Sequence, residues 1–167
     1  CDLDYVPNQA RKAKVDVGEL PTIDGDPTQL RQLIQNLVSN ALKFQTPGAS
    51  PFVRIQAKAI TTSDARGHTT FVTKNSNEAT NACDAYEITV EDNGIGFDEK
   101  YLEKMFAVFQ RLHGRQEYVG TGIGLAVCRR IVDRHGGMIT AKGKRGEGAC
   151  FIIRLPARQA KTQEGKA

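Results

Sequence analysis

Apolar residues recur at three- and four-residue steps in two segments, and this spacing predicts two long helices. The first helix is expected to begin at Asp26, because Asp26-Pro27-Thr28-Gln29 supplies an acidic N-cap, a proline at the first helical position and a glutamine able to complete a capping box. Thr46-Pro47-Gly48 is expected to end it. The second helix is predicted over Gly124 to Arg134, with His135-Gly136-Gly137 as its stop.

Alternating apolar and polar positions predict four strands, at residues 52–60, 86–90, 138–142 and 149–155. In the first strand Phe52, Ile55 and Ala57 alternate imperfectly with polar neighbours, and this strand is expected to pair with the second as a hairpin. A short strand is expected at 69–73 and a short helix at 99–106. The polar stretch at 112–120 carries glycines and charges, which are typical of a mobile loop.

Length and composition add that this is one water-soluble domain. The chain has 167 residues, 40% of them hydrophobic, and a net charge of +4 that is too small and too scattered to indicate a nucleic-acid surface. The four cysteines have no C-x-x-C spacing, so neither a zinc site nor a redox pair is predicted. The chain begins at Cys1 without a signal-type segment, and we expect a cytoplasmic domain of a parent that is either soluble or membrane-bound.

Three polar motifs carry the candidate chemistry, and the first lies on the first predicted helix. Asn36, Asn40 and Lys43 follow one another at steps of four and three residues, so they share one side of the helix beside its apolar stripe. Such a flank is commonly a solvated helix face. An asparagine carbonyl oxygen is also a suitable ligand for Mg²⁺, and position alone leaves both interpretations open.

The second motif, Glu91-Asp92-Asn93-Gly94-Ile95-Gly96, follows a predicted strand directly. Its glycines allow a sharp turn and a close approach to a ligand, and a carboxylate at the strand end can accept a hydrogen bond from an exocyclic amine. By itself the motif is more typical of an ordinary Asn-Gly turn.

The third motif, Gly120-Thr121-Gly122-Ile123-Gly124-Leu125, opens the second predicted helix. Glycines at alternate positions expose backbone N–H groups at the positive end of a helix, which suits a phosphate chain. The motif lacks the Lys-Ser/Thr of a Walker loop and the spacing of a dinucleotide-binding fold, and these two classes are therefore excluded.

Together, in this order, the motifs resemble the ATP-binding catalytic domain of sensor histidine kinases, in the superfamily shared with DNA gyrase, mismatch-repair ATPases and the large heat-shock chaperones. The resemblance spans about residues 15–156. The matching segments are Asn36 to Phe44 (N box), Asp92 to Gly96 (first glycine box), Phe106 to Phe109 (F box), Gly120 to Leu125 (second glycine box), His135-Gly136-Gly137 and Gly146 to Pro156.

The resemblance implies an α+β fold, a two-layer α/β sandwich with a mixed sheet of the Bergerat type that binds ATP and Mg²⁺. It implies a single domain over 1–167 with a core at about 15–156, a hairpin insert at 61–85, an ATP lid at about 97–121 and a polar tail at 157–167. The insert is longer than the family pattern requires, and the sequence assigns it no role.

The resemblance also implies roles for individual residues. Asp92 would receive the adenine amino group, Asn40 would ligate Mg²⁺, Asn36 would line the same polar edge, Lys43 would offset phosphate charge and Arg111 would reach the terminal phosphate. The glycine boxes would supply Gly94, Gly96, Gly120, Thr121, Gly122 and Gly124. Apolar walls would come from Phe44, Ile95, Ile123, Leu125 and Phe151, while Arg115 and His113 are weaker candidates.

The implied activity is transfer of the ATP γ-phosphate to a histidine on a separate dimerisation domain of the same parent, a homodimer that then serves a response regulator. His68, His113 and His135 do not lie in an acceptor motif, so the accepting histidine is expected elsewhere in the parent. Two alternatives stay open. They are a degenerate nucleotide-binding or docking module without transfer, and a clamp-type ATPase, which needs a base where Asn36 stands.

Overall fold

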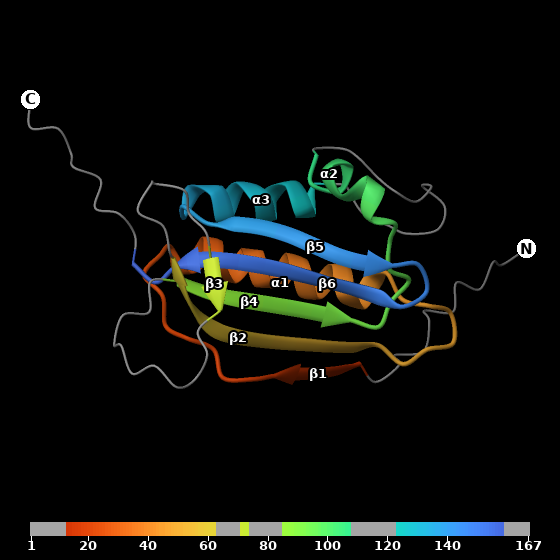
Figure 1. Cartoon of the computed structure of the whole chain (residues 1–167). Coiled ribbons are helices and arrows are strands. Elements are labelled where there is room, and N and C mark those ends of the chain that lie inside the picture. The colour runs from red at the N-terminus through yellow and green to blue at the C-terminus, as the bar shows by residue number, and fades with distance from the viewer. Residues whose placement is uncertain (1–12, 63–70, 74–84, 108–122, 159–167) are drawn as a thin grey trace, which may run out of the picture.

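The computed structural model describes residues 13–62, 71–73, 85–107 and 123–158, and it shows a sheet with helices on one face (Figure 1). Within the described residues, no helix has the length and apolar character needed to cross a membrane. The elements in chain order are β1 (Lys14–Val17), α1 (Pro27–Lys43), β2 (Phe52–Thr62), β3 (Phe71–Thr73), β4 (Ala85–Asp92), η1 (Glu99–Tyr101), α2 (Leu102–Met105), α3 (Gly124–Arg134), β5 (Met138–Lys144) and β6 (Gly148–Pro156).

The described strands form one mixed sheet in the order β1-β2-β4-β6-β5, with β3 paired to β2. β1 runs parallel to β2, and the other pairs are antiparallel. This confirms the predicted mixed α+β sandwich and the pairing of the first two predicted strands. β1 was missed because its four residues are exposed at the edge of the sheet, where burial imposes no apolar alternation.

Helix α1 begins as the capping signal predicts. The Asp26 carboxylate accepts hydrogen bonds from the backbone N–H of Thr28 (2.8 Å) and of Gln29 (3.1 Å). The helix ends at Lys43, three residues before the expected Thr46-Pro47-Gly48, because Phe44 already leaves helical geometry with φ −92° and ψ 63°. The Phe44 carbonyl accepts a hydrogen bond from the backbone N–H of Ile95, in another part of the chain.

The core lies between the helices and one face of the sheet. Val53 (0% exposed) and Ile55 (3%) are buried on β2, while Phe52 is half-buried. Phe52 and Ile55 lie three positions apart, so their side chains point to opposite faces of the strand, and this is why the alternation in the sequence is imperfect. The other core residues come from every layer: Leu33, Leu37, Ala41, Ile88, Val90, Phe97, Phe106, Cys128, Ile131, Val132, Ile139, Ala141, Phe151, Ile153 and Leu155.

Smaller differences concern element ends. The helix expected over 99–106 is a 3₁₀ turn followed by the short α2, and β5 and β6 extend beyond their predicted bounds. Pro156, which directly precedes the predicted polar tail, is the last residue of β6. β3 confirms the short strand within the 61–85 insert, whereas residues 63–70, 74–84 and 159–167 lie outside the described ranges.

Candidate functional site

The polar flank of α1 meets the start of α3 and is not simply a solvated helix face. Asn36 and Asn40 are half-buried beside the fully buried Leu33 and Leu37. The Asn36 side-chain amide donates to the carbonyl oxygen of Gly124 at 3.3 Å. The first motif therefore touches the described end of the third motif, 88 residues later in the chain.

The turn after β4 closes on the other end of α1. The backbone N–H of Ile95 donates to the Phe44 carbonyl oxygen at 3.0 Å. Asn93 fixes the turn from its far side: its side-chain oxygen accepts from the N–H of Phe52 (2.8 Å) and its amide donates to the carbonyl of Ser50 (3.0 Å). The second motif is thus joined to the C-terminus of α1 and to the start of β2.

The glycines of the turn are required by close backbone approaches within the protein. A Cβ atom at Gly94 would collide with the carbonyl oxygen of Phe44, and one at Gly96 would collide with that of Lys144. Gly96 also has φ +61°, a conformation that favours glycine. At Gly124, in contrast, a Cβ would meet no atom within 4 Å from the described part of the chain outside its own helix and chain neighbours. Among the described residues, the space beside Gly124 is therefore open, whereas the space beside Gly94 and Gly96 is filled by backbone.

Asp92 is the last residue of β4, and it shares the helix-side face with Ile88 and Val90. Its Oδ1 accepts a hydrogen bond from the N–H of Gly94 at 2.8 Å. Burial raises the pKa of Asp92, and the backbone N–H groups of Gly94 and Ala149 oppose this rise without cancelling it. A half-buried carboxylate that has a raised pKa and is held in place by a turn is typical of a ligand-binding group.

The apolar residues predicted as walls fall into two groups. Phe44, Ile95, Ile123 and Leu125 are half-buried, so each presents some surface next to the motifs. Phe151 is 5% exposed, and its ring lies edge-on to Phe106 with the centroids 6.5 Å apart. Its place is in the core behind Val90, its cross-strand neighbour, and we assign it no surface at the site.

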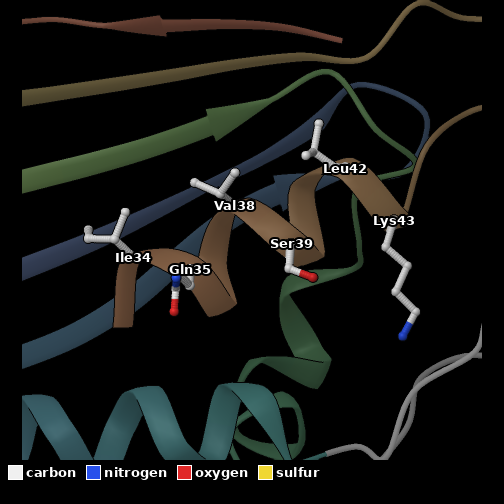
Figure 2. A pocket seen from close by; sticks show the side chains of 6 residues that line it. All are labelled: Ile34, Gln35, Val38, Ser39, Leu42 and Lys43. Atoms are coloured by element: carbon white, nitrogen blue, oxygen red, sulfur yellow. The ribbon is translucent and has the colours of Figure 1, made fainter. Parts of the chain in front are cut away.

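Lys43 lies at the C-terminal end of the polar flank, with its Nζ 5.2 Å from the centroid of the Phe44 ring. Figure 2 shows it extending to the opposite side of α1 from Val38 and Leu42. A groove of about 530 Å³ follows this helix and is lined by Ile34, Gln35, Val38, Ser39, Leu42 and Lys43. Of the predicted site residues, Lys43 borders this groove.

Several predicted residues lie outside the described ranges and stay predictions: Arg111, Gly120, Thr121 and Gly122, with the weaker candidates His113 and Arg115. The described part of the chain holds no cluster of three His, Cys, Asp or Glu side chains that could bind a metal without other ligands. Burial raises the pKa of Cys128 to about 12 and that of Cys150 to about 11, so neither thiol is poised as a nucleophile or metal ligand.

Sequence reasoning missed two supports of the site. Gly148, with φ +92°, packs against the Asp92 carbonyl, and a Cβ there would collide with that oxygen. His135, interpreted only as part of a helix stop, is 5% exposed and accepts a hydrogen bond from the N–H of Asp26 at 3.1 Å. The recurrent His-Gly-Gly signal was visible in the sequence, but its partner 109 residues away was not.

The three motifs lie within a region that matches a known protein family. The sequence profile of the family "Histidine kinase-, DNA gyrase B-, and HSP90-like ATPase" matches residues 25–159. That range contains all three motifs and both long helices.

Two curated relatives are cyanobacterial. Phytochrome-like protein Cph1 of Synechocystis sp. is 37% identical over 144 residues, which cover 86% of this chain and 16% of that protein. Cyanobacterial phytochrome A of Nostoc sp. is 39% identical over 137 residues, covering 82% of this chain and 15% of that protein. The chain thus spans about one sixth of the length of each of these relatives.

Solved structures show the same fold. Full-length ShkA in complex with AMPPNP superposes with a TM-score of 0.65 at 25% identity, over 90% of this chain and 27% of that one.

Proposed function

The chain belongs to the histidine kinase-, DNA gyrase B- and HSP90-like ATPase family, as an ATP-binding catalytic domain of the sensor histidine kinase type, and we propose that it presents Mg-ATP to a histidine on another domain of its parent. One observation carries the proposal: three sequence motifs converge at one end of the helix layer. Asn36 bonds to Gly124, and Ile95 bonds to Phe44 beside Asp92. The ShkA structure, whose title names AMPPNP, supports this choice of ligand.

Asp92 receives the adenine amino group in this proposal. An ionised carboxylate oxygen only accepts hydrogen bonds, so it suits an amine donor, and the Gly94 N–H holds it in place. Gly124 leaves open space at the N-terminus of α3, where backbone N–H groups and the helix dipole favour phosphate oxygens.

Asn40 and Lys43 serve the charged end of the ligand. Asn40 offers a neutral oxygen on a half-buried flank, and this fits Mg²⁺, which takes few protein oxygens and completes its shell with water and phosphate. When bound, the ion neutralises charge that develops on the phosphates. Lys43 adds a positive charge at the same end of α1, and Asn36 holds the start of α3 against this flank.

The proposed reaction is phosphoryl transfer. An imidazole nitrogen of the acceptor histidine forms a bond to the γ-phosphorus, the bond from that phosphorus to the β–γ bridging oxygen breaks, and ADP leaves with the electron pair. The domain contributes mainly positioning and charge stabilisation. We propose a dimeric parent as the source of the acceptor and a response regulator as the next recipient.

Hydrolysis is the less favoured alternative. A clamp-type ATPase needs a general base to activate water, and an amide at Asn36 is not basic. The structure adds that the amide nitrogen of Asn36 already donates to Gly124. Its contacts therefore suit a structural link between α1 and α3 and favour transfer over hydrolysis.

The first test separates metal binding from base binding. Asn40→Ala should weaken Mg-ATP binding by roughly 10-fold, the equivalent of about 1.4 kcal/mol, and leave adenosine binding within about 2-fold. Isothermal titration of both ligands measures the contrast. Equal losses for the two ligands would show that Asn40 supports the fold and not the metal.

The second test measures phosphoryl transfer to an acceptor domain. The chain, incubated with γ-labelled ATP, should bind nucleotide without labelling itself, and an added phosphoacceptor domain of its parent should acquire acid-labile, base-stable label. Transfer in trans should be slow, because no tether raises the effective concentration. Intact ATP binding with an unlabelled acceptor would favour the docking-module alternative, and label on the chain itself would place the acceptor histidine within it.

A further inference from the structure

We propose that His135 is a positioning residue, which in its neutral, Nδ1-protonated form ties the N-terminus of α1 to the C-terminus of α3 and so fixes the two nucleotide-site helices relative to each other. The ring lies between these two helix ends and is 5% exposed. The expected effect on nucleotide binding rests on the proposed function. The tautomer and the hydrogen bonds of the His135 ring do not depend on it.

The two hydrogen bonds of the ring define its tautomer. The backbone N–H of Asp26 donates to Nε2 at 3.1 Å, so Nε2 must be the unprotonated nitrogen. Nδ1 lies 2.7 Å from the carbonyl oxygen of Ile131, which can only accept, so Nδ1 must carry the proton. Both contacts are satisfied at once by one neutral tautomer, and by no other state of the ring.

The surrounding chain is shaped around the ring. A Cβ atom at Gly25 would lie 2.9 Å from the His135 Cδ2 and 3.0 Å from its Nε2, so a glycine is needed where α1 approaches. Gly136, with φ +70°, turns the chain immediately after the ring, and a Cβ at Gly137 would collide with the Arg154 carbonyl of β6. The ring therefore has little freedom to move from this position.

The bond from Asp26 also explains why the predicted capping box is incomplete. In that motif the N3 side chain accepts from the N-cap N–H. Here the Asp26 N–H is taken by His135, and the Gln29 side chain donates to the Asp26 carboxylate at 3.3 Å. The α1 cap is thus part of a contact between two helices and not only a local feature.

Helix α3 is joined to α1 by directional bonds at both ends of α3. Asn36 joins α1 to Gly124 at the site end, and His135 joins α3 to Asp26 at the other end. Between them Leu33, Leu37 and Cys128 pack together, and the Cys128 thiol donates a weak hydrogen bond to the carbonyl oxygen of Leu33 at 3.8 Å. The apolar packing itself is not directional. Because a misplacement of about 1 Å can cost about 100-fold in a reaction, a bond that fixes the helices along their axes matters to the site.

A matched pair of variants tests the proposal. His135→Gln places an amide oxygen near the former Nε2 and can still accept from Asp26, whereas His135→Asn is one carbon shorter and can serve only the local Ile131 contact. We expect His135→Asn to bind Mg-AMPPNP roughly 5-fold more weakly than wild type and His135→Gln to stay within about 2-fold. Val132→Ala, which shortens a neighbouring buried side chain and leaves both ring bonds intact, controls for loss of stability.

Two measurements on the ring need no nucleotide. Two-bond ¹H–¹⁵N correlation should show a neutral Nδ1–H ring in the folded protein at pH 7, and hydrogen exchange of the Asp26 amide should be faster in His135→Asn than in His135→Gln. An Nε2–H ring, or equal exchange in the two variants, overturns the proposal. So does a Val132→Ala variant that loses as much affinity as His135→Asn at the same stability. If wild type binds no Mg-AMPPNP, the proposed function fails, and the ring measurements still decide the state of His135.

Discussion

Two of the carboxylates on strand β4, Glu87 and Asp92, lie on opposite faces of the sheet and are satisfied in different ways. Glu87 lies on the face of the sheet away from the helices and is 8% exposed. Its oxygens pair with Lys58 Nζ at 2.9 Å and with Arg154 Nε at 2.8 Å, its direct neighbours on β2 and β6. Asp92, five residues later, faces the helix side and accepts from backbone N–H groups.

The pKa values of the two groups shift in opposite directions. Burial by itself would raise the pKa of Glu87, but the hydrogen bonds and charges of Lys58 and Arg154 outweigh it and hold that pKa below its ordinary value. Burial raises the pKa of Asp92, and two backbone N–H groups do not reverse this. The fold thus satisfies Glu87 internally, whereas the ionised form of Asp92 gains from an added donor such as an adenine amine.

The largest expected effect is therefore on binding and comes from Asp92→Asn. The amide presents donors as well as an acceptor toward the ligand, so nucleotide affinity should fall by about 1.5 to 3 kcal/mol, roughly 10- to 150-fold. Stability in urea should stay equal or rise, because the raised pKa shows that the ionised group is unfavourable in the folded state. Calorimetric titration that gives wild-type ATP affinity would remove Asp92 from the adenine site.

The matched change on the other face is Glu87→Gln, which should affect stability and not binding. Loss of the charge leaves Lys58 and Arg154 without their common partner, and the free energy of unfolding should fall by about 1 to 2 kcal/mol. Urea unfolding and ATP titration of the same preparation give both values. If Glu87→Gln lost as much ATP affinity as Asp92→Asn, the proposal that only the helix-side carboxylate binds the ligand would be contradicted.

Over a pH series, Glu87 and Asp92 should change the free energy of unfolding in opposite directions. The stability that Glu87 supplies is present above its unfolded pKa and is lost as pH falls through its lowered folded pKa, so the defect of Glu87→Gln should shrink in acid. Asp92 contributes stability below its unfolded pKa that is lost as pH rises through its raised folded pKa.

Of these two carboxylates, only Asp92 should affect the pH dependence of ligand affinity. Adenosine affinity should fall as pH is lowered through the raised pKa of Asp92, starting above the ordinary value of 3.8. Adenosine carries no ionising phosphate, and Asp92→Asn under the same titration controls for protonation of the base. Parallel pH profiles for wild type and Asp92→Asn would rule out a charged acceptor at this position.

The smallest effect should come from a glycine that the fold does not need. Gly124 is the first residue of α3, and within the described ranges the position of an added Cβ there is open, so Gly124→Ala should raise the free energy of unfolding by about 0.5 kcal/mol. If phosphate occupies this space, affinity for Mg-ATP should fall by roughly 3-fold while adenosine binding is retained. Unchanged Mg-ATP affinity would place the phosphates away from Gly124.

Local signals predicted the elements well because their causes are local. The Asp26 cap, the apolar stripe of α1 and the alternation on β4 and β6 each arise within a few residues, and the structure has them nearly where expected. β1 escaped because an exposed edge strand needs no apolar pattern. Helix α1 ends at Lys43, before the expected stop at Thr46-Pro47-Gly48, and the Phe44 carbonyl that follows it accepts from Ile95, 51 residues later, a contact that no local signal records.

The sequence by itself determined the family, the mixed α+β fold and the three motifs, because these follow from residue types at fixed spacing. Only the tertiary structure decided which polar residues are already satisfied. It pairs Glu87 with two cations, links Asn36 to Gly124 and His135 to Asp26, and places a half-buried carboxylate with a raised pKa at the end of β4. Desolvation and long-range hydrogen bonds depend on neighbours distant in the chain, and spacing along a sequence carries no record of them.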